Sequence, residues 1–155
     1  MYDVETRHVT EQSVATLQRS LTVGDLPAFI EKGFHRLRAA LLEASAERAG
    51  AFFVVYHGEV NDDSDGPVEL CLPFRGQLGG TGDMIVRTEP QHHEAFTTIT
   101  RSQVEFPSIL DAYAAVEGWI KREGREMAGS PREVYFVDGD VPAEEPFCDI
   151  AFPIR

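Results

Sequence analysis

The sequence predicts a single α+β domain of 155 residues, built from two copies of one strand–helix–strand–strand (βαββ) unit. Three pairs of similar segments indicate this duplication, because they occur in the same order at nearly one spacing. Leu26-Pro27 recurs as Phe106-Pro107 (107 − 27 = 80), HGEV around Gly58 as DGDV around Gly139 (139 − 58 = 81), and LCLPFR around Pro73 as IAFPIR around Pro153 (153 − 73 = 80). We therefore expect repeat one at residues 1–75, a linker at 76–83 and repeat two at 84–155.

Each repeat begins with an extended stretch that we expect to bend, at residues 2–21 and 84–100. Alternating and β-branched residues such as Val14, Thr16, Phe96 and Thr98 favour strands there. Three strands in each repeat give a sheet of six. The sheet has eight strands if each bent stretch divides in two.

An amphipathic helix follows in each repeat. Asp25 is placed to cap the first helix, Pro27 suits its first turn, and Gly50 lies past its expected end. Apolar residues recur at helical spacing from residue 29 to 41 and from 109 to 120. Pro107 opens the second helix and Gly124 is its expected stop.

Two further strands follow each helix, at residues 51–57 and 68–74 and at 133–138 and 147–154. The segment at 61–67 (NDDSDGP) reads as a turn, and the glycine-rich linker (GQLGGTGD) as a flexible connection. Neither repeat buries much by itself. Pairing them about a pseudo-twofold axis gives a curved, mainly antiparallel sheet with two helices on one face. The other face is then free to form a small-molecule cleft where the copies meet.

The charge excludes several classes of partner. Fourteen Lys and Arg stand against 26 Asp and Glu, a net charge of −12, so we expect no direct nucleic-acid binding and no membrane binding. A cationic ligand is attracted by such a chain, although the charge is also explained by solubility alone. Cys71 and Cys148 lie in apolar runs, without a signal peptide or transmembrane segment, which is typical of free thiols in the cytoplasm.

Glu133, in the segment REVYF, is the strongest candidate for function. Strand alternation places Glu133 and Tyr135 on one face, and the spacing of 81 relates Glu133 to Phe52. Together with Tyr56 they place a carboxylate among aromatic rings. Such a carboxylate has a raised pKa or needs a cation, and aromatic faces attract cations. The alternative is a solvent-facing Glu133 paired with Arg132 or Arg125.

Other candidates carry less weight. Tyr113 and Trp119 lie on the second helix, where a core position competes with a pocket position. Glu69 and Asp149 are repeat mates on end strands (149 − 69 = 80). Both are candidates for lining the cleft, but we expect solvated strand faces for them. We expect no metal site and no cofactor, because the histidines lack chelating spacing in the sequence and no nucleophile motif is present.

These segments together resemble the GyrI-like small-molecule-binding domains, which are also the effector-binding domains of AraC-type and multidrug-sensing MerR-type transcription regulators. The resemblance rests on the duplicated βαββ order and on five segments: VVYHGEV (54–60), VELCLPF (68–74), LDAYAAVEGWI (110–120), REVYF (132–136) and DIAFPI (149–154). It implies a pocket for hydrophobic, often cationic compounds, with Glu133 as the central glutamate. Many relatives carry a tyrosine where this chain has Ser108, so the aromatic ring is absent at this position, and Phe106 is the candidate to substitute for it.

Three hypotheses follow from the residues and the resemblance. The first is a stand-alone small-molecule-binding protein for hydrophobic, cationic or aromatic compounds, since the chain has no room for a helix-turn-helix domain. The second is a hydrolase of electrophilic xenobiotics such as cyclopropanoids, in which Glu133 activates water and Tyr135 or Tyr56 positions it. The third is a protein inhibitor, of gyrase for example, that acts through its acidic surface. The sequence names no protein partner.

Overall fold

The helices of the protein lie close to their expected positions. The computed structural model describes residues 2–155, and within them two α-helices occur, α1 (Leu26–Glu43) and α2 (Ile109–Arg122). Nine strands accompany them: β1 (Glu5–Val9), β2 (Gln12–Ser20), β3 (Glu47–Arg48), β4 (Phe52–Tyr56), β5 (Pro67–Arg75), β6 (Ile85–Glu89), β7 (His92–Thr100), β8 (Arg132–Tyr135) and β9 (Pro146–Ile154). The α+β class, the duplicated order and the antiparallel pairing are confirmed.

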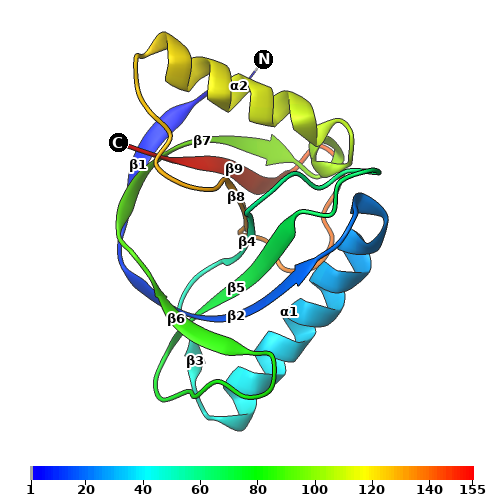
Figure 1. The fold of residues 1–155 in the computed structure, drawn as a ribbon, viewed down its shortest axis with the longest axis vertical. Coiled ribbons are helices and arrows are strands. Elements are labelled where there is room, and N and C mark those ends of the chain that lie inside the picture. The colour runs from blue at the N-terminus through cyan, green and yellow to red at the C-terminus, as the bar shows by residue number, and fades with distance from the viewer. Residues whose placement is uncertain (1) are drawn as a thin grey trace. The chain divides into compact units, whose positions relative to one another are not determined.

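The chain divides into two compact units, each with one helix. The α1 unit is Glu11–Pro90, and the α2 unit combines residues 2–10 with Gln91–Arg155. In the α1 unit the strand order is β4-β5-β2-β6, with β3 also paired to β5. In the α2 unit the order is β1-β7-β9-β8. Figure 1 shows α1 lying against β5 and β2, and α2 lying against β7 and β9.

The units do not follow the sequence repeats at their first strands. Each bent stretch divides in two, as the eight-strand alternative requires. β1 pairs with β7 of the second half of the chain, whereas β6 pairs with β2 of the first half. The chain passes between units after Thr10 and after Pro90. Each unit therefore contains a first strand from the other sequence repeat, and the repeat boundaries at 75 and 84 stay predictions.

Helix α2 ends where the sequence predicted. Gly124 has φ +65°, a left-handed conformation that favours glycine. Its N–H donates to the Lys121 carbonyl, and the N–H of Arg125 donates to the Ile120 carbonyl. This pair of bonds is the Schellman motif, which satisfies the last carbonyls of the helix.

The start and end of α1 differ from the prediction. Asp25 is the N-cap residue, but in the described chain its carboxylate makes no capping hydrogen bond, so that expectation is wrong. The helix ends at Glu43, before the short strand β3, rather than beside Gly50. The two residues of β3 carry no alternation that a sequence pattern could reveal.

Each helix packs on its own sheet through small and aliphatic residues. In α1 the buried residues are Gly33, Leu37 and Leu41, and in α2 they are Ile109, Ala112, Val116 and Ile120. Gly33 permits a close approach, because a Cβ there would stand 2.2 Å from Cδ1 of Leu70 on β5. Neither helix of residues 2–155 is long and apolar enough to cross a membrane.

Candidate functional site

Glu133 lies on the face of β8 that α2 covers. It is opposite Ile150 in the register with β9, and Tyr135 is opposite Cys148. Residues that are directly opposite in antiparallel strands share a face, and both Ile150 and Cys148 belong to the core that packs against α2. Strand alternation therefore predicted correctly that Glu133 and Tyr135 share a face.

Two tyrosine hydroxyls bind the Glu133 carboxylate. Tyr113 of α2 donates to Oε2 and Tyr135 of β8 donates to Oε1, each at 2.5 Å. Glu133 is only 4% exposed, so its carboxyl group lies within the protein and not in bulk water. Hydrogen bonds from hydroxyl groups stabilise the charged form of a carboxylate in such surroundings.

Each of the two tyrosine rings packs against a further aromatic ring. Tyr113 meets Phe152 edge-on with centroids 5.7 Å apart, and Tyr135 meets Phe147 edge-on at 5.8 Å. All four rings belong to the core that α2 covers or pack against it. Tyr113 and Tyr135 are partly exposed, so the buried carboxylate is connected to the surface through aromatic side chains.

The solvent-facing alternative for Glu133 is wrong. Arg132, on the opposite face of β8, binds Glu94 through two hydrogen bonds, and Nε of Arg125 donates to the Arg155 carbonyl. The burial of Glu133 follows from the register of β8, which places its side chain between the sheet and the helix.

The remaining predicted residues divide between the two units. In the α2 unit, Trp119 packs against the core and Phe106 is 41% exposed beside its cis bond to Pro107. In the α1 unit, Phe52 is buried and contacts Phe34 of α1 with centroids 4.8 Å apart, while Tyr56 is partly exposed. That these four residues line a ligand site stays a prediction.

Sequence reasoning missed a buried ionic cluster on the other face of the α2 unit. Glu94 is fully buried, and its carboxylate accepts hydrogen bonds from Arg7 at 2.7 Å, from Arg132 at 2.8 Å and from His92 at 3.0 Å. Arg7 also donates to Asp149 at 2.8 Å. We expected a solvated Asp149, but it is only 7% exposed, so that expectation is wrong.

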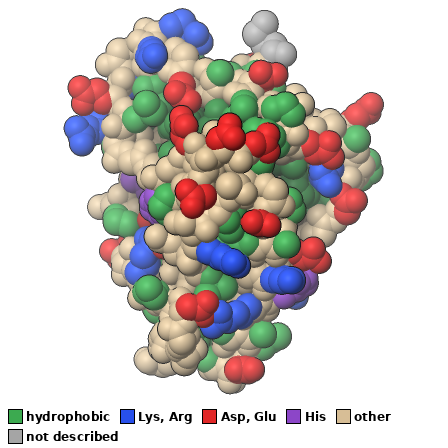
Figure 2. Space-filling view, turned by 45° about the vertical axis from the view of Figure 1, so that its right-hand side comes forward, with side chains coloured by type: hydrophobic (Ala, Val, Ile, Leu, Met, Phe, Trp, Pro, Cys, Tyr) green, Lys and Arg blue, Asp and Glu red, His purple; other side chains and the backbone are tan. Residues whose placement is uncertain are grey.

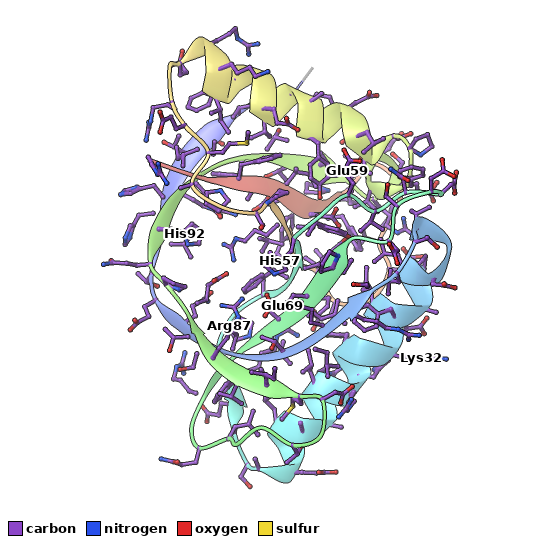
Figure 3. All side chains as sticks on the ribbon, in the orientation of Figure 1. Lys32, His57, Glu59, Glu69, Arg87 and His92 are labelled. Carbon is purple, nitrogen blue, oxygen red and sulfur yellow. The ribbon has the colours of Figure 1, made fainter. Side chains whose placement is uncertain are left out.

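The α1 unit contains a related cluster. Glu69 accepts hydrogen bonds from Arg87 at 2.8 and 3.1 Å and is paired with His57 at 2.9 Å, and Arg87 also reaches Glu89. Figure 3 shows His57, Glu69 and Arg87 together on the side of the sheet away from α1. Glu69 is 6% exposed, which corrects the expected solvated position.

The sequence did hold a signal for both clusters. Arg7 and Arg87 differ by 80, as do Glu69 and Asp149, so one equivalent arginine–carboxylate pair occurs in each unit. In both pairs the arginine and the carboxylate come from different sequence repeats.

The charges of the clusters alter several pKa values. Burial acts to raise the pKa of Glu94, but hydrogen bonds from His92 and Arg132 and the charges of Arg132 and Arg7 lower it to about 2. Burial likewise opposes the hydrogen bonds from Arg87 and His57 at Glu69, whose pKa is lowered. Burial, then the nearby Glu133 charge, raises the pKa of the Cys148 thiol. Cys148 is therefore a protonated core residue, and Cys71 is also buried and free.

The described residues contain no group of three or more His, Cys, Asp or Glu side chains arranged to hold a metal ion. The chemistry at Glu133 is that of an anionic acceptor with two phenol donors and aromatic walls. Such a set can hold a positive charge or direct a proton.

Comparison with known proteins identifies the fold. No family model matches the chain, and no curated protein matches it in sequence. The EcmrR C-terminal domain superposes with a TM-score of 0.79 at 18% identity, covering 100% of this chain and 98% of that one. EcmrR in a complex with DNA gives a TM-score of 0.82 at 19% identity. This alignment covers 99% of this chain and 57% of the EcmrR chain.

Two further structures are informative. SAV2435 bound to tetraphenylphosphonium has a TM-score of 0.57 at 13% identity, covering 99% of this chain and 94% of that one. A hydrolase from Listeria innocua has a TM-score of 0.67 at 10% identity, covering 98% of this chain and 91% of that one. The chain therefore has the fold of the GyrI-like effector-binding domains, and the resemblance seen in the sequence is confirmed at the level of the fold.

Proposed function

We propose that this chain binds hydrophobic organic cations at Glu133, as a sensor or sequestering protein for such compounds. The observation that carries the proposal is a carboxylate 4% exposed, with one tyrosine hydroxyl on each oxygen and aromatic rings around them.

Burial raises the free-energy cost of a charge on this carboxylate. A charge removed from water is stabilised by donors and by opposite charge. Tyr113 and Tyr135 supply two donors. A bulky cation without N–H or O–H groups adds the opposite charge and does not compete for those hydrogen bonds. The faces of the aromatic rings attract the same cation.

The charge of the whole chain favours the same ligands. Acidic side chains are spread over the face drawn in Figure 2, with basic ones among them, and the net charge is −12. A negative protein raises the local concentration of cations and the rate at which they arrive. The likeness to SAV2435, solved with tetraphenylphosphonium, supports this choice of ligand.

Direct titration tests the proposal. Tetraphenylphosphonium and a planar cationic dye should bind the wild-type chain and raise its Tm. Glu133→Gln keeps the shape of the side chain and removes its charge, so its affinity for tetraphenylphosphonium should fall at least about tenfold, equal to roughly 1.4 kcal/mol.

Glu126→Gln is the matched control. Glu126 is exposed in the α2 unit, and its substitution changes the net charge by the same amount. This variant should bind like the wild type. Equal binding by the Glu133→Gln and Glu126→Gln variants would refute the role of Glu133.

A hydrolase is the second candidate, supported by the contact between Glu133 and Tyr135 and by the hydrolase among the similar structures. Here Glu133 takes a proton from water while a tyrosine hydroxyl orients the substrate. A cyclopropanoid substrate should then give a ring-opened product, which disappears with Glu133→Gln. Binding of the substrate without turnover would reject catalysis and leave the binding proposal intact.

A further inference from the structure

Two histidines of the α2 unit face each other across neighbouring strands. His8 of β1 and His93 of β7 are directly opposite in the antiparallel register, and their ring centroids are 5.0 Å apart with planes inclined by 56°. Both side chains are exposed to solvent. They lie on one face of the sheet, since opposite residues of a ladder point the same way.

Their rings differ from those of His92 and His57 in their surroundings. His92 and His57 are paired with the carboxylates of Glu94 and Glu69. Among residues 2–155, the one side-chain hydrogen bond, ion pair or ring contact of His8 and His93 is the contact between their own rings. Their nitrogens are therefore open to a ligand from solvent.

The spacing of the rings suits one metal ion between them. Imidazole nitrogens bind Zn²⁺ at about 2.0–2.1 Å, so two imidazoles on one tetrahedral ion have centroids about 5 Å apart. Both side chains are exposed, and the proposal requires that they rotate about χ1 and χ2 until one nitrogen of each ring points at the ion. Imidazole is a ligand that Ni²⁺, Cu²⁺ and Zn²⁺ accept readily.

We propose that His8 and His93 form a two-histidine chelate for a late first-row divalent metal ion, with water at the remaining positions. The two residues are 85 apart in sequence (93 − 8 = 85), so they do not form an HxxH-type motif. The site has two protein ligands, fewer than the groups of three that are absent from the described residues.

The site has a structural consequence. β1 is the edge strand of its sheet, and it pairs with β7 alone within the described residues. A metal ion bound by both strands cross-links them near the C-terminal end of β1. The chain enters the α1 unit shortly after this point, after Thr10. Binding to the folded state should therefore stabilise the protein.

Zinc titration and nickel affinity test this site in the untagged chain. The wild type should bind one Zn²⁺ in calorimetry, gain about 3 °C or more in Tm at saturating Zn²⁺, and be retained on a nickel-charged chelating resin. His8→Asn should weaken Zn²⁺ binding tenfold or more and abolish retention, and His93→Asn should do the same.

The key variant is His8→Asn, because it leaves the adjacent pair His92 and His93 in place. His35→Asn, which replaces an exposed histidine of α1, is the control and should bind zinc and nickel as the wild type does. Unchanged binding by a folded His8→Asn variant would overturn the proposal. So would an equal loss in His35→Asn, since it would indicate binding to scattered surface histidines.

Discussion

In the α1 unit, the partly exposed Phe34 of the helix contacts the buried Phe52 of β4 with ring centroids 4.8 Å apart. In the α2 unit, Tyr113 of the helix contacts Glu133 of β8 through a hydrogen bond of 2.5 Å. Each contact joins the helix of its unit to the strand that pairs beside β5 or β9. The α1 unit therefore has apolar side chains where the α2 unit has a phenol and a carboxylate.

The positions correspond by burial as well as by sequence. Buried residues of the two helices match at a spacing of 79, as in Gly33 with Ala112 (112 − 33) and Leu37 with Val116 (116 − 37). The same spacing relates Phe34 to Tyr113 (113 − 34). In the sheet, Glu133 corresponds to the buried Val54, because Glu133 is opposite Ile150, Val54 is opposite Leu70, and these two partners differ by 80 (150 − 70). The expected match of Glu133 with Phe52 is therefore wrong.

The polar pair in the α2 unit, compared with the apolar pair in the α1 unit, indicates a role in binding. Replacing buried charges by apolar residues of similar volume is often neutral or stabilising by about 1–4 kcal/mol. The α1 unit demonstrates that the fold accepts the apolar arrangement at this position. A polar group in the equivalent position of the α2 unit is therefore better explained by binding than by stability.

The largest expected effect is on the buried ionic clusters, where Glu94 can be compared with Glu69. Glu94→Ala leaves Arg132 buried without its carboxylate and should destabilise the protein by about 3–5 kcal/mol. Glu69→Ala should lower the free energy of unfolding by less, because the Arg87 side chain that loses its carboxylate is 30% exposed. Urea unfolding measures both, and a greater loss in Glu69→Ala would reverse the proposed ranking.

Acid should act through the same carboxylate. The pKa of Glu94 is about 2 in the folded chain and 4.5 in the reference state. Because its folded pKa is lowered, its contribution is present above pH 4.5 and is lost as the pH falls through 2. That loss is on the order of 3 kcal/mol. Urea unfolding of the wild type and of Glu94→Gln, measured between pH 6 and 2.5, should give converging stabilities, and parallel curves would contradict the assignment.

The comparison itself can be tested by making the α2 unit resemble the α1 unit. The double variant Glu133→Met with Tyr113→Phe removes the carboxylate and one phenol at nearly constant volume. It should gain about 1–3 kcal/mol of stability and lose cation binding. Glu133→Met alone should gain less, because it leaves the Tyr113 hydroxyl without this acceptor. A destabilised double variant would indicate that the polar contact serves the fold.

The smallest effect concerns the two matched glycine and alanine positions on the helices. Gly33→Ala should destabilise the protein by about 1 kcal/mol, because steric crowding exceeds the gain in helix propensity. The crowding arises at Cδ1 of Leu70, 2.2 Å from the new Cβ. Ala112→Gly should also lose about 1 kcal/mol, through propensity and lost packing. Thermal unfolding of both variants measures these changes. A stabilised Gly33→Ala variant would contradict the predicted crowding, since it would indicate that Leu70 moves to another rotamer.

The elements were predictable because they depend on local patterns. The strands at 68–74 and 147–154 lie within β5 and β9, and Gly124 stops α2 through a local backbone conformation. The exchange of β1 and β6 between units was not predictable, since strand alternation does not specify which strand pairs with which.

The site was predictable only in part, for the same reason. The shared face of Glu133 and Tyr135 follows from alternation within one strand. The hydrogen bond from Tyr113 depends on how α2 is rotated on its sheet, and the sequence left that residue between core and pocket. His8 and His93 come together only through the pairing of β1 with β7.

The central claim is that the Glu133 carboxylate selects positive charge, and a paired titration tests it most directly. The affinities for tetraphenylphosphonium and for the neutral triphenylphosphine oxide are measured in the wild type and in Glu133→Gln. We expect the wild type to prefer the cation by at least about tenfold, and this preference to disappear in the variant. A preference that survives the substitution would contradict the claim.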